Sequence, residues 1–323
     1  MQDEGIVSRR GRRLHLTTQV NKTESASSLL GNTVLVVTSV DPAAKTIRQG
    51  WLGQVIEGLL GEAHQQNCNA MIVHPQRIVN ESARLLAASP IGLVLLGMDR
   101  SAQTLQTFEQ AGLPLILYGD EFESHGHDMI TPDHVKGSYD ITRWLIARGA
   151  KRILRIWTHR YAGQPRPIWL SHRDQGFEQA MNEASLPVIP ALEFARRSVG
   201  PDEDSFDLYV RDLAGRMVEH MIGPEPVDAI VLPNDGSVSI TASACRLYGK
   251  VPNRDVLIAG YDNDWKMGHF IDRDPTPPAV TTAHDTVHLG QALIQTLLER
   301  AGNPSVPPKR ISLPPRLIVP GHN

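Results

Sequence analysis

The chain has 323 residues, enough for about two domains, and its charged (21%) and hydrophobic (41%) fractions exclude a wholly disordered chain or a coiled coil. No apolar run reaches the ~20 residues that a membrane span needs, and the charged N-terminus lacks the apolar core of a secretory signal. Two cysteines, Cys68 and Cys245, are too few for a disulfide framework or a four-thiolate zinc site. We therefore expect two reduced, buried thiols in a cytoplasmic protein.

The charge is unevenly distributed along the chain. Residues 1–32 carry five Lys and Arg against three Asp and Glu, a net charge of +2, whereas the remainder carries a net charge of −5. Only the N-terminal tail therefore has an electrostatic footprint for nucleic acid.

The first half of the chain alternates apolar runs with helical patterns. Residues 19–32 are polar and Ser-rich, which is typical of a linker. Residues 33–39 form a β-branched apolar run that predicts a buried strand, and apolar residues from Ile47 to Ala63 then recur at helical spacing. Further strands are predicted at 70–73, 91–96, 115–118 and 152–157, and helices at 82–88, 104–111 and 135–148.

The second half continues this alternation. Helices are predicted at 173–183, 206–222, 237–248 and 287–300, and strands at 192–194, 229–232, 256–260, 280–282 and 311–319. Such alternation implies βαβ units, and there are too many units for one ordinary sheet. We predict an α/β protein with two doubly wound parallel-sheet lobes. Ligands of such sheets bind outside the carboxyl ends of the strands, here in the cleft between the lobes.

Enzyme signatures are absent: there is no G-x-S-x-G, P-loop, H-E-x-x-H, or G-x-G-x-x-G after a strand. The densest histidine cluster, at residues 125–128, matches no metal-ligand spacing, so solvated loop histidines are the expectation there. We expect no catalytic residues, no metal and no cofactor.

Polar side chains follow several predicted strands. Those with this placement are Ser39, Asp41, Asn234, Asp235 and Asp262, and Arg173 begins a helix after a long loop. Carboxylates, amides and guanidinium groups suit the vicinal hydroxyls of a sugar. Aromatic rings that could cover the apolar face of a sugar ring are Trp51, Trp169 and Tyr261. Alternatively, Asn234 and Asp235 only cap the next helix, and Arg173 pairs with a surface carboxylate.

Five stretches carry a recognisable pattern: RDQGFEQA at 173–180, DAIVLPND at 228–235, VPNRDVLIAGYDN at 251–263, PPAVTT at 277–282 and LPPRLIV at 313–319. As a set, in order and spacing, they resemble the LacI/GalR family of sugar-responsive repressors over residues 33–319. The resemblance implies the periplasmic-binding-protein-like type I fold, with three crossings between lobes, an effector in the cleft and a homodimer. The expected N-lobe is 33–156 with 284–309, and the expected C-lobe is 157–283 with 310–319.

The resemblance also implies an effector site. The family's effector-lining positions correspond to Arg173, to Asn234 with Asp235, and to Asp262. The family's aromatic pair aligns with Trp51 and Leu52, so its second aromatic is absent here.

Residues 1–18 instead resemble the end of a GntR-type winged-helix domain, where a helix ends and a two-stranded basic wing begins. The matching residues are Glu4, Gly5, Ile6, Val7, Arg9, Arg10 and Gly11. A GntR/LacI hybrid regulator would carry only a remnant of that domain here, and would bind operator DNA through a more complete N-terminal domain. Arginines expected to contact phosphates or the minor groove are Arg9, Arg10, Arg12 and Arg13. Alternatively, residues 1–18 are a disordered basic tail.

Together these features predict a cytoplasmic, ligand-responsive transcriptional repressor that is not an enzyme and has no membrane partner. Its effector would be a sugar or sugar derivative. One alternative is the solute-binding component of a sugar transporter, which would require export of a longer precursor. The other is a hydrolase or transferase, which would require a nucleophile and a base in the cleft.

Overall fold

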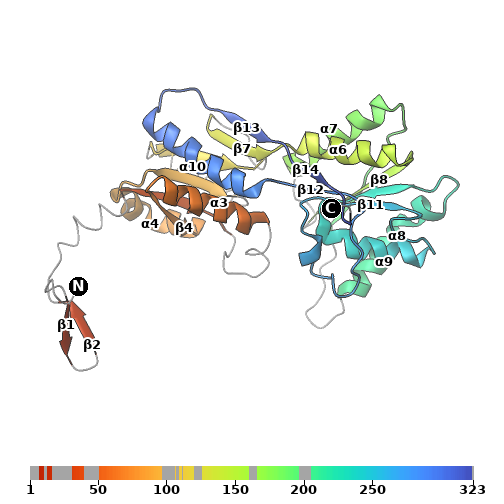
Figure 1. The fold of residues 1–323 in the computed structure, drawn as a ribbon, viewed down its shortest axis with the longest axis horizontal. Coiled ribbons are helices and arrows are strands. Elements are labelled where there is room, and N and C mark those ends of the chain that lie inside the picture. Colours follow the sequence, from red (N-terminus) through yellow and green to blue (C-terminus); the bar gives the residue numbers. More distant parts are fainter. Residues whose placement is uncertain are drawn as a thin grey trace.

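The computed structural model describes residues 7–10, 13–16, 31–39, 51–96, 106, 109–110, 112–119, 126–159, 166–195 and 205–321. Two α/β lobes lie side by side, joined by segments that cross between them (Figure 1). Each lobe is built on a parallel sheet that has helices on both faces. The predicted fold class is therefore confirmed.

The N-lobe holds a six-stranded parallel sheet in the order β13-β7-β6-β5-β3-β4. Its strands are β3 (Thr33–Val37), β4 (Asn69–Val73), β5 (Gly92–Leu96), β6 (Leu115–Tyr118), β7 (Asp128–Pro132) and β13 (Arg310–Leu313). Val34 and Val36 face the core under α3 (Trp51–Gln65) and α10 (Thr286–Gly302), whereas Leu35 and Val37 face the core under α4 (Pro75–Ala87). Because both faces are covered, the strands read as continuous apolar runs.

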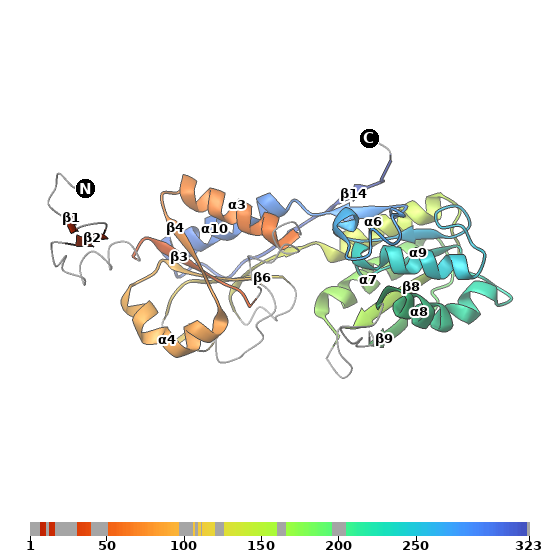
Figure 2. The ribbon, with the colours of Figure 1, turned by 90° about the horizontal axis from the view of Figure 1, so that it is seen from below.

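The C-lobe repeats this design with a parallel sheet in the order β11-β10-β8-β9. Its strands are β8 (Ile153–His159), β9 (Leu192–Ala195), β10 (Ala229–Val231) and β11 (Leu257–Ala259). One core lies under α6 (His134–Ala147) and α7 (Ile168–Glu183), and the other lies under α8 (Ser205–Ile222) and α9 (Val238–Leu247). Strands β12 (Thr281–Ala283) and β14 (Arg316–Ile318) pair antiparallel beside β11 (Figure 1). Figure 2 shows β14 close to α6.

The chain crosses between the lobes three times: at Asp133, at residues 284–285, and at Pro314 and Pro315. The first crossing corrects the predicted limits, because α6 packs on α7 and β8 lies inside the C-lobe sheet. The N-lobe's first segment thus ends near residue 132 instead of 156.

The last predicted strand, 311–319, is also corrected. It consists of β13, which pairs with β7 in the N-lobe, and β14, which pairs with β12 in the C-lobe. The two prolines between them lack the N–H groups that a continuous strand would donate, so the run is interrupted there. Its first residues therefore belong to the N-lobe and not to the C-lobe.

At the N-terminus, β1 (Val7–Arg10) and β2 (Arg13–Leu16) pair antiparallel, with Arg10 opposite Arg13. This matches the two strands expected of the basic segment. Arg12, most of the expected linker and most of the expected helix at 104–111 lie outside the described residues. Cys68 and Cys245 are buried and free. None of the described helices has the length and apolar character needed to cross a membrane.

Two glycines allow α3 and α10 to approach closely. A Cβ atom on Gly58 would lie 2.2 Å from the carbonyl oxygen of Val287, and one on Gly290 would lie 2.1 Å from that of Val55. Both separations are shorter than any real contact. The two helices can therefore pack this closely only because both positions are glycine. Gly61, three residues further along α3, has open space around it.

We expect Gly58→Ala to lower the free energy of unfolding by about 1–3 kcal/mol, because the two helices must separate. Gly61→Ala should instead raise it by up to about 1 kcal/mol, since alanine favours a helix interior. Urea unfolding followed by circular dichroism measures both. Equal stability of the two variants would contradict the close helix contact.

Candidate functional site

Arg173 on α7 is the centre of a buried polar cluster. Its side chain lies four residues after Trp169, in the next helical turn, because α7 begins at Ile168 and not at the predicted residue 173. The guanidinium carbon is 4.5 Å from the ring centroid of Trp169 and 3.4 Å from that of Tyr261. Only 4% of the residue is exposed. The alternative of a surface ion pair is therefore wrong.

The donors of Arg173 have acceptors on several elements. Nη1 donates to the carbonyl oxygen of Pro233. Nε and Nη2 each lie 3.3 Å from Nδ1 of His134, the first residue of α6. Nη2 is also 3.9 Å from Oδ1 of Asp262. One side chain thus connects α6, the end of β10 and the turn after β11.

Asp262 occupies an unusual backbone conformation. Its φ angle is +88° and that of the next residue, Asn263, is +55°, both in the left-handed region that side chains other than Gly and Asn rarely adopt. Oδ1 of Asp262 lies 3.3 Å from Nε2 of His284, directly after β12. Strain of this kind gathers at functional sites, where the surroundings over-determine the conformation.

Asp235 supports the adjoining loop. It is 2% exposed, and Oδ1 accepts a hydrogen bond from Thr281 Oγ1 at 2.9 Å while Oδ2 accepts one from the amide of Asp264 at 3.0 Å. Burial, reinforced by Asp262 and Asp264, raises the pKa of Asp235 well above its ordinary value. A Cβ atom on Gly260 would overlap this carboxylate, so a glycine is needed there.

Asn234 precedes a short 3-10 helix, η1 (Asp235–Ser237), with an exposed, extended conformation. Its side chain makes no capping hydrogen bond to that helix. Asp235 directs its carboxylate to Thr281 and Asp264 instead. The alternative that these two residues only cap the next helix is therefore wrong.

The predicted residues separate into two groups. Trp169, Arg173 and Asp262 lie in one cluster, and Asn234 and Asp235 follow Pro233, which that cluster contacts. Of the others, Ser39 is an exposed residue after β3, and Trp51 is the first residue of α3. Asp41 lies outside the described residues.

Two histidines of the cluster are absent from the predicted set. His134 is 8% exposed, the side chain of His284 is 5% exposed, and their ring centroids are 6.0 Å apart. Each lies at a crossing between the lobes, so a search for polar residues at the ends of β7 and β12 could have found them. Within the described residues, no group of three or more His, Cys, Asp or Glu side chains could hold a metal ion.

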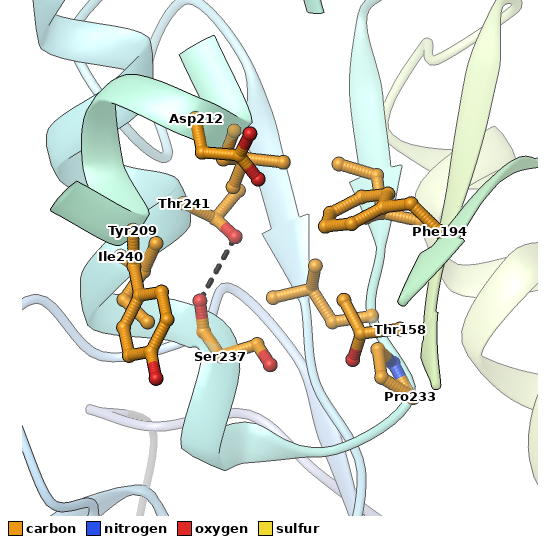
Figure 3. Close-up of a pocket in the computed structure, with 11 residues that line it drawn as sticks. Thr158, Phe194, Tyr209, Asp212, Pro233, Ser237, Ile240 and Thr241 are labelled. Atoms are coloured by element: carbon orange, nitrogen blue, oxygen red, sulfur yellow. Dashed lines mark hydrogen bonds between the residues drawn. The ribbon is translucent and has the colours of Figure 1, made fainter. Parts of the chain in front are cut away.

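A pocket lies on the other side of the loop after β10 (Figure 3). The empty space between its walls, together with the adjoining open solvent, is about 390 Å³. Its lining includes Thr158, Phe194, Tyr209, Pro233 and Thr241, and Thr241 Oγ1 donates to the carbonyl oxygen of Ser237. Pro233 therefore separates this pocket from the Arg173 cluster, and both lie at the carboxyl end of the C-lobe sheet.

Comparisons with known proteins agree with this architecture. Residues 142–321, more than half of the chain, match the model of the periplasmic binding protein-like domain. The transcriptional repressor PurR of Histophilus somni is 26% identical over 250 residues, covering 76% of this chain and 68% of that protein. The sucrose operon repressor of Escherichia coli is 26% identical over 220 residues, covering 65% and 59%.

A solved structure gives the same result for the fold. The regulatory protein of the LacI family from Chloroflexus aggregans superposes with a TM-score of 0.70 at 18% identity, covering 90% of this chain and 98% of that one. Two of these relatives are named as repressors and the third as a regulatory protein.

The buried carboxyl of Asp264 provides a test of the site's electrostatics. Burial and the nearby Asp262 raise the pKa of Asp264 to about 6, and its Oδ1 has no hydrogen-bond partner among the described residues. The carboxyl of Asp264 therefore binds its proton more tightly in the folded state than in the unfolded state. As the pH rises from about 4 to 6, this difference lowers the free energy of unfolding.

Asp264→Asn should raise the free energy of unfolding at pH 8 by about 1–3 kcal/mol, since each pKa unit is about 1.4 kcal/mol. The advantage should shrink as the pH falls from 6 towards 4. Thermal unfolding across this pH range measures it. An advantage that is independent of pH would rule out a raised pKa as its cause.

Proposed function

The chain belongs to the periplasmic binding protein-like family, and on that premise we propose that it is a ligand-responsive transcriptional repressor of the LacI type. Its effector is a sugar or sugar derivative that binds between the lobes. The observation that carries this proposal is the Arg173 cluster, which combines hydrogen-bonding groups and aromatic rings beside the crossings. Repressors among the relatives, one named for the sucrose operon, support it.

The chemistry of the cluster suits a polyhydroxy ligand. The Asp262 carboxylate accepts hydrogen bonds from hydroxyl groups, the exposed Asn234 amide can both donate and accept, and Arg173 offers paired donors. Trp169 provides an aromatic ring for the apolar face of a sugar. Asp235, by contrast, is occupied by Thr281 and Asp264, so we assign it to supporting the loop.

Effector binding would act by population shift. An effector that binds the closed cleft more tightly than the open one moves the lobes about the three crossings. In a homodimer, this movement changes the separation of the two DNA-binding heads on a palindromic operator. A complete change of state requires an affinity difference of about 10⁴-fold.

The basic hairpin β1–β2 would contribute phosphate contacts. Its register pairs Arg10 with Arg13 and Arg9 with Leu14. A cluster of arginines in a short segment is the electrostatic footprint of a polyanion binder. Phosphate contacts position a protein on DNA but read little sequence.

The effector proposal is tested by a thermal-shift screen of sugars, sugar phosphates and purines. A ligand at about 100 times its Kd adds about 2.7 kcal/mol, which raises the melting temperature by a few degrees. Arg173→Ala and Arg173→Lys should abolish the shift. Arg254→Ala should preserve it, because that side chain is exposed and paired with Asp255. Ligand binding without any effect on DNA binding would favour a transporter's solute-binding component.

The DNA proposal is tested by anisotropy titrations with labelled duplex DNA at several salt concentrations. We expect weak, non-specific binding by this chain. Replacing Arg9, Arg10 and Arg13 with alanine should weaken it and lower the salt slope by about 0.9 for each lost phosphate contact. Arg254→Ala again serves as the control. A tight, salt-resistant complex with one sequence would contradict this expectation.

A further inference from the structure

His134 lies between the first crossing, at Asp133, and Arg173, the side chain proposed to bind the effector. It follows Asp133, the residue at which the chain passes from β7 into the C-lobe, and it begins α6. Asp133 caps that helix by accepting a hydrogen bond from the amide of Lys136. The imidazole is therefore held on a capped helix start, and it is directed at Arg173 of the neighbouring helix α7.

The contact with Arg173 determines the form of the imidazole. Arginine has only donors, so Nδ1 of His134, which faces both Nε and Nη2, must be an acceptor. An imidazole that accepts at Nδ1 is neutral and carries its proton on Nε2. Protonation at Nδ1 would remove this acceptor and place a second positive charge against the guanidinium.

The surroundings disfavour that protonation. Burial, followed by the positive charge of Arg173, lowers the pKa of His134 well below 6.5. His284 and His172 act in the same direction. The titratable groups around the imidazole are Asp133 on its own element, Arg173 and His172 on α7, Tyr261 and Asp262 after β11, and His284 after β12. Asp262 faces both Arg173 and His284, and its Oδ1 lies 3.3 Å from Nε2 of His284.

We propose that His134 is a positioning residue for Arg173, which it holds at Nδ1 only while the imidazole is neutral. The assignment of Arg173 to effector binding rests on the proposed function, whereas the contact itself does not. Acid therefore releases Arg173 from the first crossing. Any ligand that needs the guanidinium in this position binds more weakly once the pH is low enough to protonate folded His134, well below 6.5, with no change in the ligand's own charge.

The first experiment observes both partners without a ligand. In the full chain labelled with ¹⁵N at histidine and arginine, we expect the His134 ring to give the signals of a proton on Nε2 and a bare Nδ1 from pH 8 to about pH 6. The Nε–H of Arg173 should exchange slowly at pH 7.5. Spectra of His134→Asn and Arg173→Lys assign the two signals.

Two variants separate the acceptor from the ring. His134→Asn retains an acceptor close to the position of Nδ1 but does not titrate, whereas His134→Phe retains the ring and lacks the acceptor. We expect slow exchange of the Arg173 Nε–H to survive in the first variant and to be lost in the second. A proton on Nδ1, titration of His134 near 6.5, or slow exchange in His134→Phe would overturn the proposal.

The pH profile of thermal unfolding provides a readout that a purely structural role would not change. Because His134 stays neutral in the folded state but titrates normally in the unfolded state, stability should be lost as the pH falls below 6.5. Between pH 7.5 and 5.5, the melting temperature of the native chain should fall about three degrees more than that of His134→Asn. His64→Asn should follow the native profile. Parallel profiles for the native chain and His134→Asn would refute the neutral-imidazole requirement.

These results distinguish this inference from the proposed function. If the His134 signature holds but no ligand shift responds to Arg173→Lys, the effector assignment fails and the positioning role stands. If ligand binding depends on Arg173 while the His134 signature is absent, the positioning role fails and the effector assignment stands.

Discussion

The arrangement at the junction of the lobes depends on one requirement: a guanidinium removed from water must direct its donors at acceptors. Arg173 meets this requirement with acceptors from three elements: the start of α6, the end of β10 and the turn after β11. Its own helix adds the aromatic ring of Trp169. An unpaired buried charge would cost several kcal/mol. The elements that supply these acceptors are therefore connected by a single side chain, and one of them, α6, begins at the first crossing.

The same cluster holds three carboxyl groups close together. Asp235, Asp262 and Asp264 lie within one loop system, and burial together with mutual repulsion raises the pKa of two of them. The Thr281 hydroxyl and the amide of Asp264 offset part of this cost by donating hydrogen bonds to Asp235. The backbone is thus strained at Asp262, and ionisation is disfavoured at Asp264. The two packed cores of the C-lobe hold the site in this arrangement.

Much of the architecture was predictable from hydropathy, since strands covered on both faces read as apolar runs whatever the tertiary structure. Asp262 was predictable because polar residues at strand ends of parallel sheets gather at one edge, and Arg173 was predictable from the resemblance to the LacI/GalR family. The lobe limits were not: α6 has the periodicity of a helix in either lobe, and only its packing on α7 decides between them. His134 and His284 were missed for a related reason. In a chain with 13 histidines, local sequence does not distinguish a buried imidazole from a solvated one.

The three crossings differ in stiffness. Pro314 and Pro315 fix φ near −65° at two successive positions, and Pro315 lies against α6 where Gly137 leaves room for it. The backbone of that connection therefore has little freedom to rotate about φ. Any rotation of one lobe against the other must then be taken up as backbone torsion at Asp133 and at residues 284–285. His134 follows Asp133 directly and His284 lies within the other segment, so rotation of the lobes would change the backbone next to two buried imidazole rings.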